Sequence, residues 1–458
     1  MTLPFLDRAD ERAALGQFVS GREGGFGVLF GRRRCGKSRL LQESLPSGRS
    51  IYYVGDDREG AVQRVALAAE IGRRLPGFDA VRYPDWDALL SRFFREAPAG
   101  SVLALDEFPA LVRAAGELPS VLQKHLDRRP LTTVHVVVAG SSQRLMQGLV
   151  LDRAAPLFGR ATAIIPVHPL PAGWIQNALP VRDPREAIEA FAVWGGVPRY
   201  WELAADHASL PQAVRALVLS PLGVLHDEPS RLLLDDLRDT TQAASLLSLV
   251  ARGSHRLSEI AGRIEKPATS LGRPMQRLLD LGLVHREMPF GSSLRDTKRT
   301  LYKVSDPFLR YWFRYVEPAW SRLEARQFEA VAADIGGTFA HHVAGVWEDL
   351  ARASVARLSA FGHAWRPASR WWGTGLDGQP MEIDVVAESD DESSLLLGEA
   401  GWTRAGDAAS RLAALRRKAE AFPLRGGRTV RLALFLPDPA RLTGARVFTP
   451  RHVLAALR

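Results

Sequence analysis

The fold of this chain is decided by the stretch Val28-Leu29-Phe30-Gly31-Arg32-Arg33-Arg34-Cys35-Gly36-Lys37-Ser38. A short apolar run leads into the pattern G-x-x-x-x-G-K-S, and helix-forming residues 39–43 follow it. A strand, a glycine-rich loop and a helix in this order form the context that a phosphate-binding P-loop requires. The two glycines permit tight turns and a close approach of the backbone to phosphate groups. The stretch therefore predicts that the chain binds a nucleoside triphosphate.

The P-loop pattern also predicts what single residues do. Lys37 is expected to reach the β- and γ-phosphates, and Ser38 to hold Mg²⁺. The N-terminus of the following helix adds partial positive charge at the same place. ATP and Mg²⁺ are thus the expected cofactors. The predicted nucleotide contacts are Gly31, Arg32, Arg33, Arg34, Cys35, Gly36, Lys37, Ser38 and Arg39.

Length and composition limit the class of protein. A chain of 458 residues is too long for one ordinary core, so several domains are expected. The only cysteine, Cys35, allows no internal disulfide, which suits a reducing cytoplasm. No signal-peptide plan and no long uncharged apolar run is present, so a cytoplasmic protein without a membrane segment is expected. The net charge of +9 favours an anionic partner.

A second buried strand delivers two carboxylates. The run Ser101-Val102-Leu103-Ala104-Leu105 is apolar and is followed directly by Asp106 and Glu107. A parallel strand of this kind places such acids at the carboxyl edge of its sheet. Asp106 is expected near the Mg²⁺ shell, and Glu107 is expected to polarise the attacking water as a catalytic residue. The alternative is a strand followed by a solvated acidic turn.

Two further residues are candidates for sensing the γ-phosphate. A strand over 131–139 ends in Gly140-Ser141-Ser142, where Ser141 would face the phosphate or simply cap the next helix. Arg160, before the strand at 163–167, would act as a sensor or, across a subunit interface, as an arginine finger, unless it is an ordinary surface arginine. With strands alternating with helices, residues 1–170 are predicted to form a doubly wound α/β core.

These motifs together resemble the archaeal-type ATPases of the AAA+/STAND group. The resemblance rests on Gly31–Ser38, 105–107, 140–142 and 157–160, and it extends to Gly195-Gly196-Val197-Pro198-Arg199-Tyr200, which is similar to a turn in that family's helical lid. It implies ATP hydrolysis, with Lys37, Glu107 and Arg160 as catalytic residues, and a lid over 171–235. The lid turn either contacts nucleotide or is purely structural.

Residues 236–318 have the pattern of a winged helix-turn-helix. Apolar residues at helical spacing predict helices at 243–251, 256–264 and 270–280, and strands at 283–287 and 300–304 flank a basic turn. A third helix of this arrangement can enter a DNA major groove. The alternative is a winged domain used only for protein packing. The candidate DNA phosphate contacts are Arg256, Arg273, Arg277, Arg295, Lys298 and Arg299.

After a linker at 319–335, residues 336–458 resemble a PD-(D/E)xK nuclease domain, of restriction-endonuclease-like α/β fold. Glu348 lies on an expected helix, Asp384 on a strand and Glu399 on the next strand, and the resemblance implies a second Mg²⁺ site formed by these three. Position 401, where the nuclease pattern has lysine, is glycine, and Arg404, Arg416 and Lys418 are candidates to replace it. This departure favours a fold retained for binding or packing over an active nuclease.

Three functions follow as hypotheses. The first is an ATP-hydrolysing protein whose nucleotide state controls how the winged-helix module grips duplex DNA. The second is an ATP-regulated, Mg²⁺-dependent DNA nuclease. The third is a nucleotide-switched scaffold that binds protein and no DNA. A homo-oligomer or a protein partner is compatible with each of them.

Overall fold

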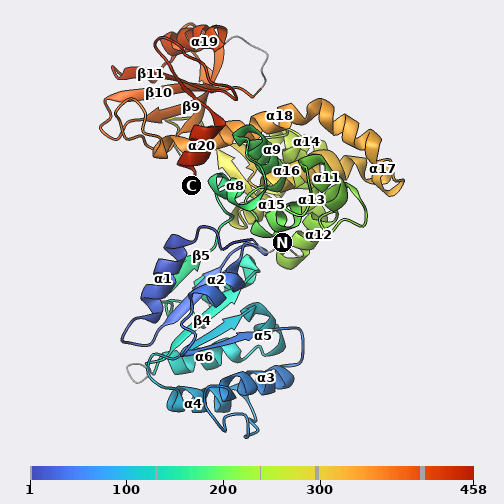
Figure 1. Ribbon diagram of the computed structural model, residues 1–458, viewed down its shortest axis with the longest axis vertical. Helices are drawn as coiled ribbons and strands as arrows, with labels where there is room; N and C mark the ends of the chain where they lie inside the picture. The colour runs from blue at the N-terminus through green and yellow to red at the C-terminus, as the bar shows by residue number, and fades with distance from the viewer. Residues whose placement is uncertain (1–2, 129–132, 154, 238, 294–298, 403–407) are drawn as a thin grey trace. The chain divides into compact units, whose positions relative to one another are not determined.

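The computed structural model describes residues 3–128, 133–153, 155–237, 239–293, 299–402 and 408–458. The chain forms two compact units (Figure 1), one of Asp7–Pro169 and the other of Met1–Leu6 with Leu170–Arg458. Among the described residues, no helix combines the length and the apolar character needed to cross a membrane.

The first unit is built on a five-stranded sheet in the order β2-β3-β4-β1-β5, in which every pairing is parallel. The strand that enters the P-loop, β1, is separated from the strand that ends in Asp106, β3, by β4. The strands are β1 (Phe26–Phe30), β2 (Ser50–Val54), β3 (Val102–Asp106), β4 (His135–Gly140) and β5 (Ala163–Pro166). The sequence placed the start of β4 near 131, but His135 begins it, and residues 129–132 lie outside the described part.

Helices pack against this sheet and close its core. They are α1 (Ala9–Val19), α2 (Lys37–Ser44), α3 (Gly60–Gly72), α4 (Trp86–Glu96), α5 (Phe108–Ala114), α6 (Leu118–Leu126) and α7 (Gln143–Met146), followed by η1 (Gln147–Leu151). Phe26, Leu103, Leu105 and Val138 are fully buried between the sheet and the helices. Every residue of β3 is buried, and its only polar side chain, that of Asp106, lies at the carboxyl end of the strand. The predicted doubly wound α/β P-loop fold is confirmed.

The second unit begins with helices in the predicted lid. They are η2 (Ala172–Trp174), α8 (Ile175–Ala178), α9 (Pro184–Trp194), α10 (Pro198–Ala204), α11 (Leu210–Val214), η3 (Arg215–Leu219) and α12 (Glu228–Asp236). The turn Gly195-Gly196-Val197-Pro198 joins α9 to α10, and Gly195 has a φ of 58°. The Gly195 carbonyl accepts a hydrogen bond from Trp201 Nε1 at 2.7 Å. This turn therefore has a structural role within its own unit.

Three helices and a two-stranded hairpin follow in the segment where a winged helix-turn-helix is predicted. They are α13 (Thr240–Ala251), α14 (Leu257–Ile264), α15 (Ala268–Asp280) and the antiparallel pair β6 (Val284–Glu287) and β7 (Leu301–Val304). Leu271, Met275 and Leu278 bury one face of α15. Pro274 lies inside α15.

The predicted linker at 319–335 is mostly helical. The chain continues through α16 (Pro307–Tyr311), η5 (Trp312–Val316), η6 (Glu317–Ala319), α17 (Trp320–Glu324), α18 (Phe328–Ser354) and η7 (Val355–Arg357). Leu323, Val331 and Ile335 are buried in the main core of the unit. Both helices of this segment therefore bury apolar side chains, and the C-terminal part shares a core with the helices before it.

The C-terminal part contains a five-stranded mixed sheet in the order β12-β11-β10-β9-β8. Strands β8, β9 and β10 pair antiparallel, and β10, β11 and β12 pair parallel. The elements are β8 (Ser369–Thr374), β9 (Pro380–Glu388), β10 (Ser394–Ala400), α19 (Ala408–Ala421), β11 (Thr429–Phe435), β12 (Arg446–Phe448) and α20 (Pro450–Ala456). Helix α19 packs on β9, β10 and β11, whereas α18 contacts β9 and β10 (Figure 1). Alternate strand residues are therefore buried on both faces of the sheet.

Candidate functional site

The two P-loop glycines are required by the local backbone. Gly31 has a φ of 156°, and a Cβ there would lie 2.2 Å from the carbonyl oxygen of Val167. Gly36 has a φ of 91° and is the N-cap of α2. A side chain at Gly31 would therefore collide with the backbone beside β5, and one at Gly36 would be strained. The loop conformation that a phosphate needs is built into the fold.

Lys37 wraps back over the loop that it follows. Its Nζ donates hydrogen bonds to the carbonyl oxygens of Gly31 at 2.8 Å and of Arg32 at 3.0 Å. Ser38 is exposed at the first turn of α2, whereas Cys35 is buried. Burial raises the pKa of the Cys35 thiol, because the effect of removing the thiolate from water exceeds that of the nearby cations. Cys35 thus contributes packing to the loop.

The remaining P-loop arginines differ in exposure. Arg32 is buried, Arg33 is exposed, and Arg34 and Arg39 are half-buried. Arg34 has a φ of 67°, a left-handed conformation uncommon for a residue with a side chain. Arg39 lies 3.8 Å from Glu43 on the same helix. Their predicted contacts with nucleotide stay predictions.

Arg8 clamps the P-loop from the start of α1. Its guanidinium donates to the carbonyl oxygens of Cys35 at 3.0 Å and His168 at 2.7 Å, and it pairs with Glu11 at 2.8 Å. The side chain is almost fully buried. Sequence reasoning missed this residue, because nothing local in residues 7–12 indicates a bond to a loop 27 residues later.

The carboxyl ends of β3 and β4 bring three predicted residues together. Glu107 adopts a left-handed φ of 48° and is the N-cap of α5. Ser141 Oγ donates a hydrogen bond to Glu107 Oε2 at 2.9 Å. Asp106 Oδ1 accepts from the Glu107 backbone N–H at 2.9 Å. Strained backbone of this kind concentrates at functional sites, so the arrangement supports a positioned carboxylate.

Tyr52 connects the Asp106 carboxylate to the P-loop helix. Its hydroxyl donates to Asp106 Oδ2 at 2.7 Å. Burial, and then the negative charge and hydrogen bond of Asp106, raise the pKa of Tyr52, whereas the Ser38 and Gln42 side chains act in the opposite direction. Asp106 and Ser38, the two predicted Mg²⁺ ligands, thus both lie within reach of one hydroxyl. The strand register pairs Val54 with Asp106, a neighbour relation that sequence reasoning did not use.

Arg160 is held by an acid on α6. Its Nε and Nη2 donate to the two carboxylate oxygens of Asp127 at 2.7 and 2.8 Å, and Nη1 donates to the carbonyls of Pro156 and Phe158. This bidentate pair fixes the guanidinium at the surface of the unit. A role on the phosphates would require Arg160 to leave Asp127, so its predicted catalytic role stays a prediction.

The candidate DNA contacts divide into three groups. Arg273 and Arg277 lie one helical turn apart on α15 and are exposed, and Arg256 is exposed at the N-cap of α14. Arg299 instead donates to the carbonyl oxygen of Trp372 on β8, which ties it to the neighbouring sheet. Arg295 and Lys298 lie outside the described residues.

The C-terminal carboxylates Asp384 and Glu399 lie on the neighbouring strands β9 and β10. The antiparallel register ends with Val385 opposite Gly398, and the next residues beyond this pair are Asp384 on β9 and Glu399 on β10. Burial and then the charge of Asp384 raise the pKa of both Glu348 and Glu399 to about 7. Lys418 Nζ, from α19, donates to Glu399 Oε1 at 2.7 Å. Lys418 of the helix is therefore the cation paired with Glu399, whereas the side chain next to Gly401 is that of Arg411.

The predicted three-carboxylate metal site stays a prediction, since Glu348, Asp384 and Glu399 are not grouped as metal ligands in the described part of the chain. Within the described ranges, no three or more His, Cys, Asp or Glu side chains are positioned to hold a metal ion. Part of the reason is that Asp384 Oδ2 accepts the backbone N–H of Ala400 at 2.9 Å and Glu399 is paired with Lys418. Of the other two candidates for the missing lysine, Arg416 donates to the Thr443 carbonyl at 2.7 Å, and Arg404 lies outside the described part.

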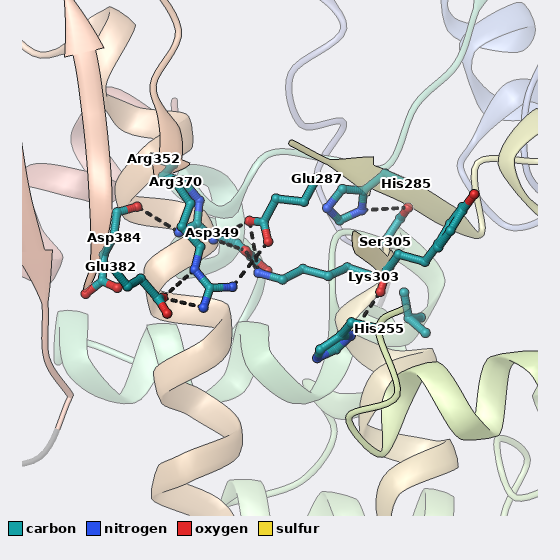
Figure 2. A network of polar contacts seen from close by, with 12 residues as sticks. His255, His285, Glu287, Lys303, Ser305, Asp349, Arg352, Arg370, Glu382 and Asp384 are labelled. Carbon is teal, nitrogen blue, oxygen red and sulfur yellow. Dashed lines mark hydrogen bonds and ion pairs between the residues drawn. The ribbon is translucent and has the colours of Figure 1, made fainter. Parts of the chain in front are cut away.

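A buried ionic network lies beside these acids (Figure 2). Asp349 accepts from Arg310 at 2.9 Å and from Arg352 at 2.5 Å, and lies 3.5 Å from Lys303. Burial alone would raise the pKa of Asp349, but these three cations hold it well below its usual range. Glu287 of β6 joins the network through Lys303 at 3.1 Å. The hairpin β6–β7 is thus linked ionically to α18.

Comparisons with known proteins agree with this fold. A family model, DUF234, described as archaeal and bacterial proteins of unknown function, matches residues 312–413. The uncharacterized protein MJECL04 of Methanocaldococcus jannaschii is 25% identical over 404 residues, which cover 87% of this chain and 87% of that protein. The similarity to this relative thus extends over most of the chain, whereas the family model matches only residues 312–413.

Solved structures show the fold more directly. The Walker-type ATPase paby2304 of Pyrococcus abyssi aligns with a TM-score of 0.51 at 18% identity, covering 67% of this chain and 95% of its own. The ORC2 protein of Aeropyrum pernix, in its ADPNP–ADP complexes, aligns with a TM-score of 0.44 at 14% identity, covering 71% and 96%. The similarity to the Pyrococcus abyssi protein shows a shared fold.

Proposed function

We propose that the Asp7–Pro169 unit binds ATP with Mg²⁺ and hydrolyses it, and that its nucleotide state controls a DNA-binding surface on α15. The observation that carries the proposal is the meeting of Lys37, Asp106, Glu107 and Ser141 at the carboxyl edge of one parallel sheet. This edge is where ligands of open α/β sheets bind. The name of the Pyrococcus abyssi neighbour, a Walker-type ATPase, supports the same activity.

Each residue at this edge has a task that its present contacts support. Lys37 donates hydrogen bonds to the carbonyl oxygens of Gly31 and Arg32. When nucleotide binds, it would donate instead to β- and γ-phosphate oxygens. The bound Mg²⁺ would supply charge neutralisation on the phosphates. The exposed Ser38 hydroxyl and the Asp106 carboxylate offer the hard oxygen ligands that Mg²⁺ prefers.

Glu107 would orient the attacking water and accept its proton. Its carboxylate is held by Ser141 from the neighbouring strand, so its position is fixed before substrate arrives. Tyr52 plays the same positioning part for Asp106. Because Arg8 holds the Cys35 carbonyl, the P-loop is also fixed in advance. The unit therefore presents a preorganised site for phosphoryl transfer to water.

DNA binding is supported by the exposed arginines of α14 and α15. Arg273 and Arg277 lie opposite the buried face of α15, so the helix has an apolar side for its core and a cationic side for a partner. Arginines at such positions contact phosphates and make binding weaken as salt rises. Arg299 donates to the carbonyl oxygen of Trp372 and is not part of this proposed surface, so its predicted DNA contact stays a prediction.

The test measures duplex DNA binding by fluorescence anisotropy over a salt series, and ATP hydrolysis with and without that DNA. The double variant Arg273→Gln/Arg277→Gln should lower the slope of log K against log salt by about 1.8, since each phosphate contact contributes about 0.9. Arg322→Gln serves as control, because Arg322 is an exposed arginine on α17 that pairs with Asp334 of α18 and lies outside α14 and α15. Binding that is absent or insensitive to salt would instead support a protein-binding scaffold.

A second function, phosphodiester cleavage, is favoured by one observation. Lys418 supplies from α19 the cation that Gly401 cannot, 2.7 Å from Glu399. Lys418 would orient a water or stabilise the leaving oxygen beside Asp384 and Glu399. Cleavage of linear duplex DNA should then need Mg²⁺ in the buffer and be lost in Asp384→Ala and Lys418→Met, but persist in the exposed control Lys266→Met. Intact DNA with the wild-type protein would leave the domain a binding module.

A further inference from the structure

The second unit contains a cavity that the proposed functions do not use. It measures about 530 Å³ and lies among the end of α13, β7, the α16–η5 helix, α18 and β8. Ligand pockets commonly have volumes of about 300 to 1,000 Å³. A cavity of this size accommodates a molecule of mononucleotide size.

The lining of the cavity is strongly cationic. Five permanently charged residues line it, against one carboxylate, Glu348. They come from separate segments of the chain, and they are Arg252, Lys303, Arg310, Arg314 and Arg370. Cations that line a hollow raise the positive electrostatic potential inside it and so favour an anion there. The chemistry of the lining thus favours an anion with several oxygens, which arginine forks recognise best.

Three of these cations are paired with acids, and two of the three, Lys303 and Arg370, are labelled in Figure 2. Arg370 pairs with Glu287 at 3.4 Å and also with Glu382. Lys303 and Arg310 pair with Asp349, and Lys303 also with Glu287. Their acids are not among the lining residues. The wall is therefore preorganised, and little side-chain freedom would be lost when a ligand binds.

Two other cations are available to a ligand. Arg252 and Arg314 form no ion pair within the described ranges, and Arg314 lies 5.4 Å from the ring centre of Tyr315. The lining also includes His342, whose Nε2 lies 2.9 Å from the Ala192 carbonyl oxygen and must donate to it. Its Nδ1, an acceptor in that tautomer, is buried without a hydrogen-bond partner in the described part of the chain. A phosphorylated ligand that carries a hydroxyl suits both features.

We propose that this cavity binds the phosphate group of a ligand of about mononucleotide size, independently of the P-loop. The phosphate would lie against Arg252 and Arg314, facing the fixed wall of Lys303, Arg310 and Arg370. Two sources carry this chemistry, a free nucleotide and the phosphorylated end of a nucleic-acid strand. Neither the ATPase proposal nor the cleavage proposal is needed for it.

The test is calorimetric titration of pyrophosphate, with EDTA and low salt, into the full chain carrying Lys37→Ala to weaken the P-loop site. Binding should persist in this background and weaken at least tenfold when Arg314→Gln or Arg252→Gln is added. Arg252 is exposed, so its variant keeps the test valid if the half-buried Arg314 variant fails to fold. Arg322→Gln is the charge-matched control and should bind as the background does.

Competition then distinguishes the two sources. Displacement of pyrophosphate by AMP, and not by a 5′-phosphorylated oligonucleotide, supports a free nucleotide. Displacement by that oligonucleotide, and not by its unphosphorylated form, supports a strand end. No pyrophosphate binding in the Lys37→Ala background, or equal weakening in the Arg322→Gln control, would overturn the proposal.

Discussion

Ser141 Oγ donates a 2.9 Å hydrogen bond to Glu107 Oε2, which joins the carboxyl ends of two neighbouring parallel strands. Glu107 has a left-handed φ of 48°, a conformation that costs roughly 1 kcal/mol or more for a residue with a side chain. The backbone strain and the hydrogen bond both fix one carboxylate. We interpret this relationship as the positioning of the hydrolytic base.

Ser141→Ala should therefore slow ATP hydrolysis while leaving ATP binding nearly unchanged. Loss of one hydrogen bond to a charged group corresponds to about 1.5 kcal/mol, or roughly a tenfold lower kcat. Steady-state kinetics measure this, with Ser91→Ala on α4 as a control for loss of a hydroxyl. A KM that rises while kcat is constant would place Ser141 on the substrate instead of on Glu107.

Tyr52→Phe should weaken the apparent affinity for Mg²⁺ more than it weakens ATP affinity. The variant keeps the ring and removes only the hydroxyl that holds Asp106 Oδ2 at 2.7 Å. We expect a roughly threefold to tenfold higher Mg²⁺ concentration for half-maximal hydrolysis, corresponding to about 1 kcal/mol. Tyr53→Phe, which removes the adjacent hydroxyl on the same strand, is the matched control. Equal effects of the two variants would contradict a specific role for Tyr52.

Much of the first unit follows from local sequence, because its signals are local. The strands ending in Phe30 and Asp106 lie within two residues of their predicted bounds, since each is an apolar run. The contacts that position the site were not predictable in this way. Arg8 with the Cys35 carbonyl and Tyr52 with Asp106 depend on which strands become neighbours, and that order is set by the packing of the whole unit.

The second unit differs from the sequence prediction at its linker. Residues 319–335 were predicted as a linker, yet Leu323, Val331 and Ile335 are buried in the core of the unit. The carboxylates Asp384 and Glu399, and three candidate replacements for the missing lysine, were named from the resemblance to the nuclease pattern. The sequence could not choose among the three candidates, whereas the fold pairs Lys418, from a helix 19 residues further along, with Glu399.

Asp349→Asn should strongly destabilise the second unit. The aspartate compensates Arg310, Arg352 and Lys303 in a buried setting, and removing one partner of a buried ion pair costs about 3–5 kcal/mol. Chemical denaturation followed by tryptophan fluorescence measures this. Asp334→Asn, which breaks an exposed pair with Arg322, should cost less than about 1 kcal/mol. Similar costs for both would mean that the network is well solvated.

Glu348→Gln should stabilise the protein at high pH only. Burial and Asp384 raise the pKa of Glu348 to about 7, opposed by Arg352 and Lys303. Between pH 4.5 and pH 7 the folded state therefore binds more protons than the unfolded state, so this group's contribution to stability falls as pH rises. Relative to wild type, the variant should gain roughly 3 kcal/mol at pH 8 and nothing at pH 4. The exposed control Glu186→Gln should show no such pH dependence, and a pH-independent gain in Glu348→Gln would contradict the account.

The central claim, that the first unit binds ATP and hydrolyses it through Glu107, is tested most directly by Glu107→Gln. Equilibrium binding of ATP and single-turnover hydrolysis, both with Mg²⁺, are measured for wild type, Glu107→Gln and Lys37→Ala. We predict that Glu107→Gln binds ATP as wild type does but hydrolyses it at least about 100-fold more slowly, as loss of a general base requires. Lys37→Ala should lose most of its binding. Unchanged hydrolysis in Glu107→Gln, or unchanged binding in Lys37→Ala, would contradict the account.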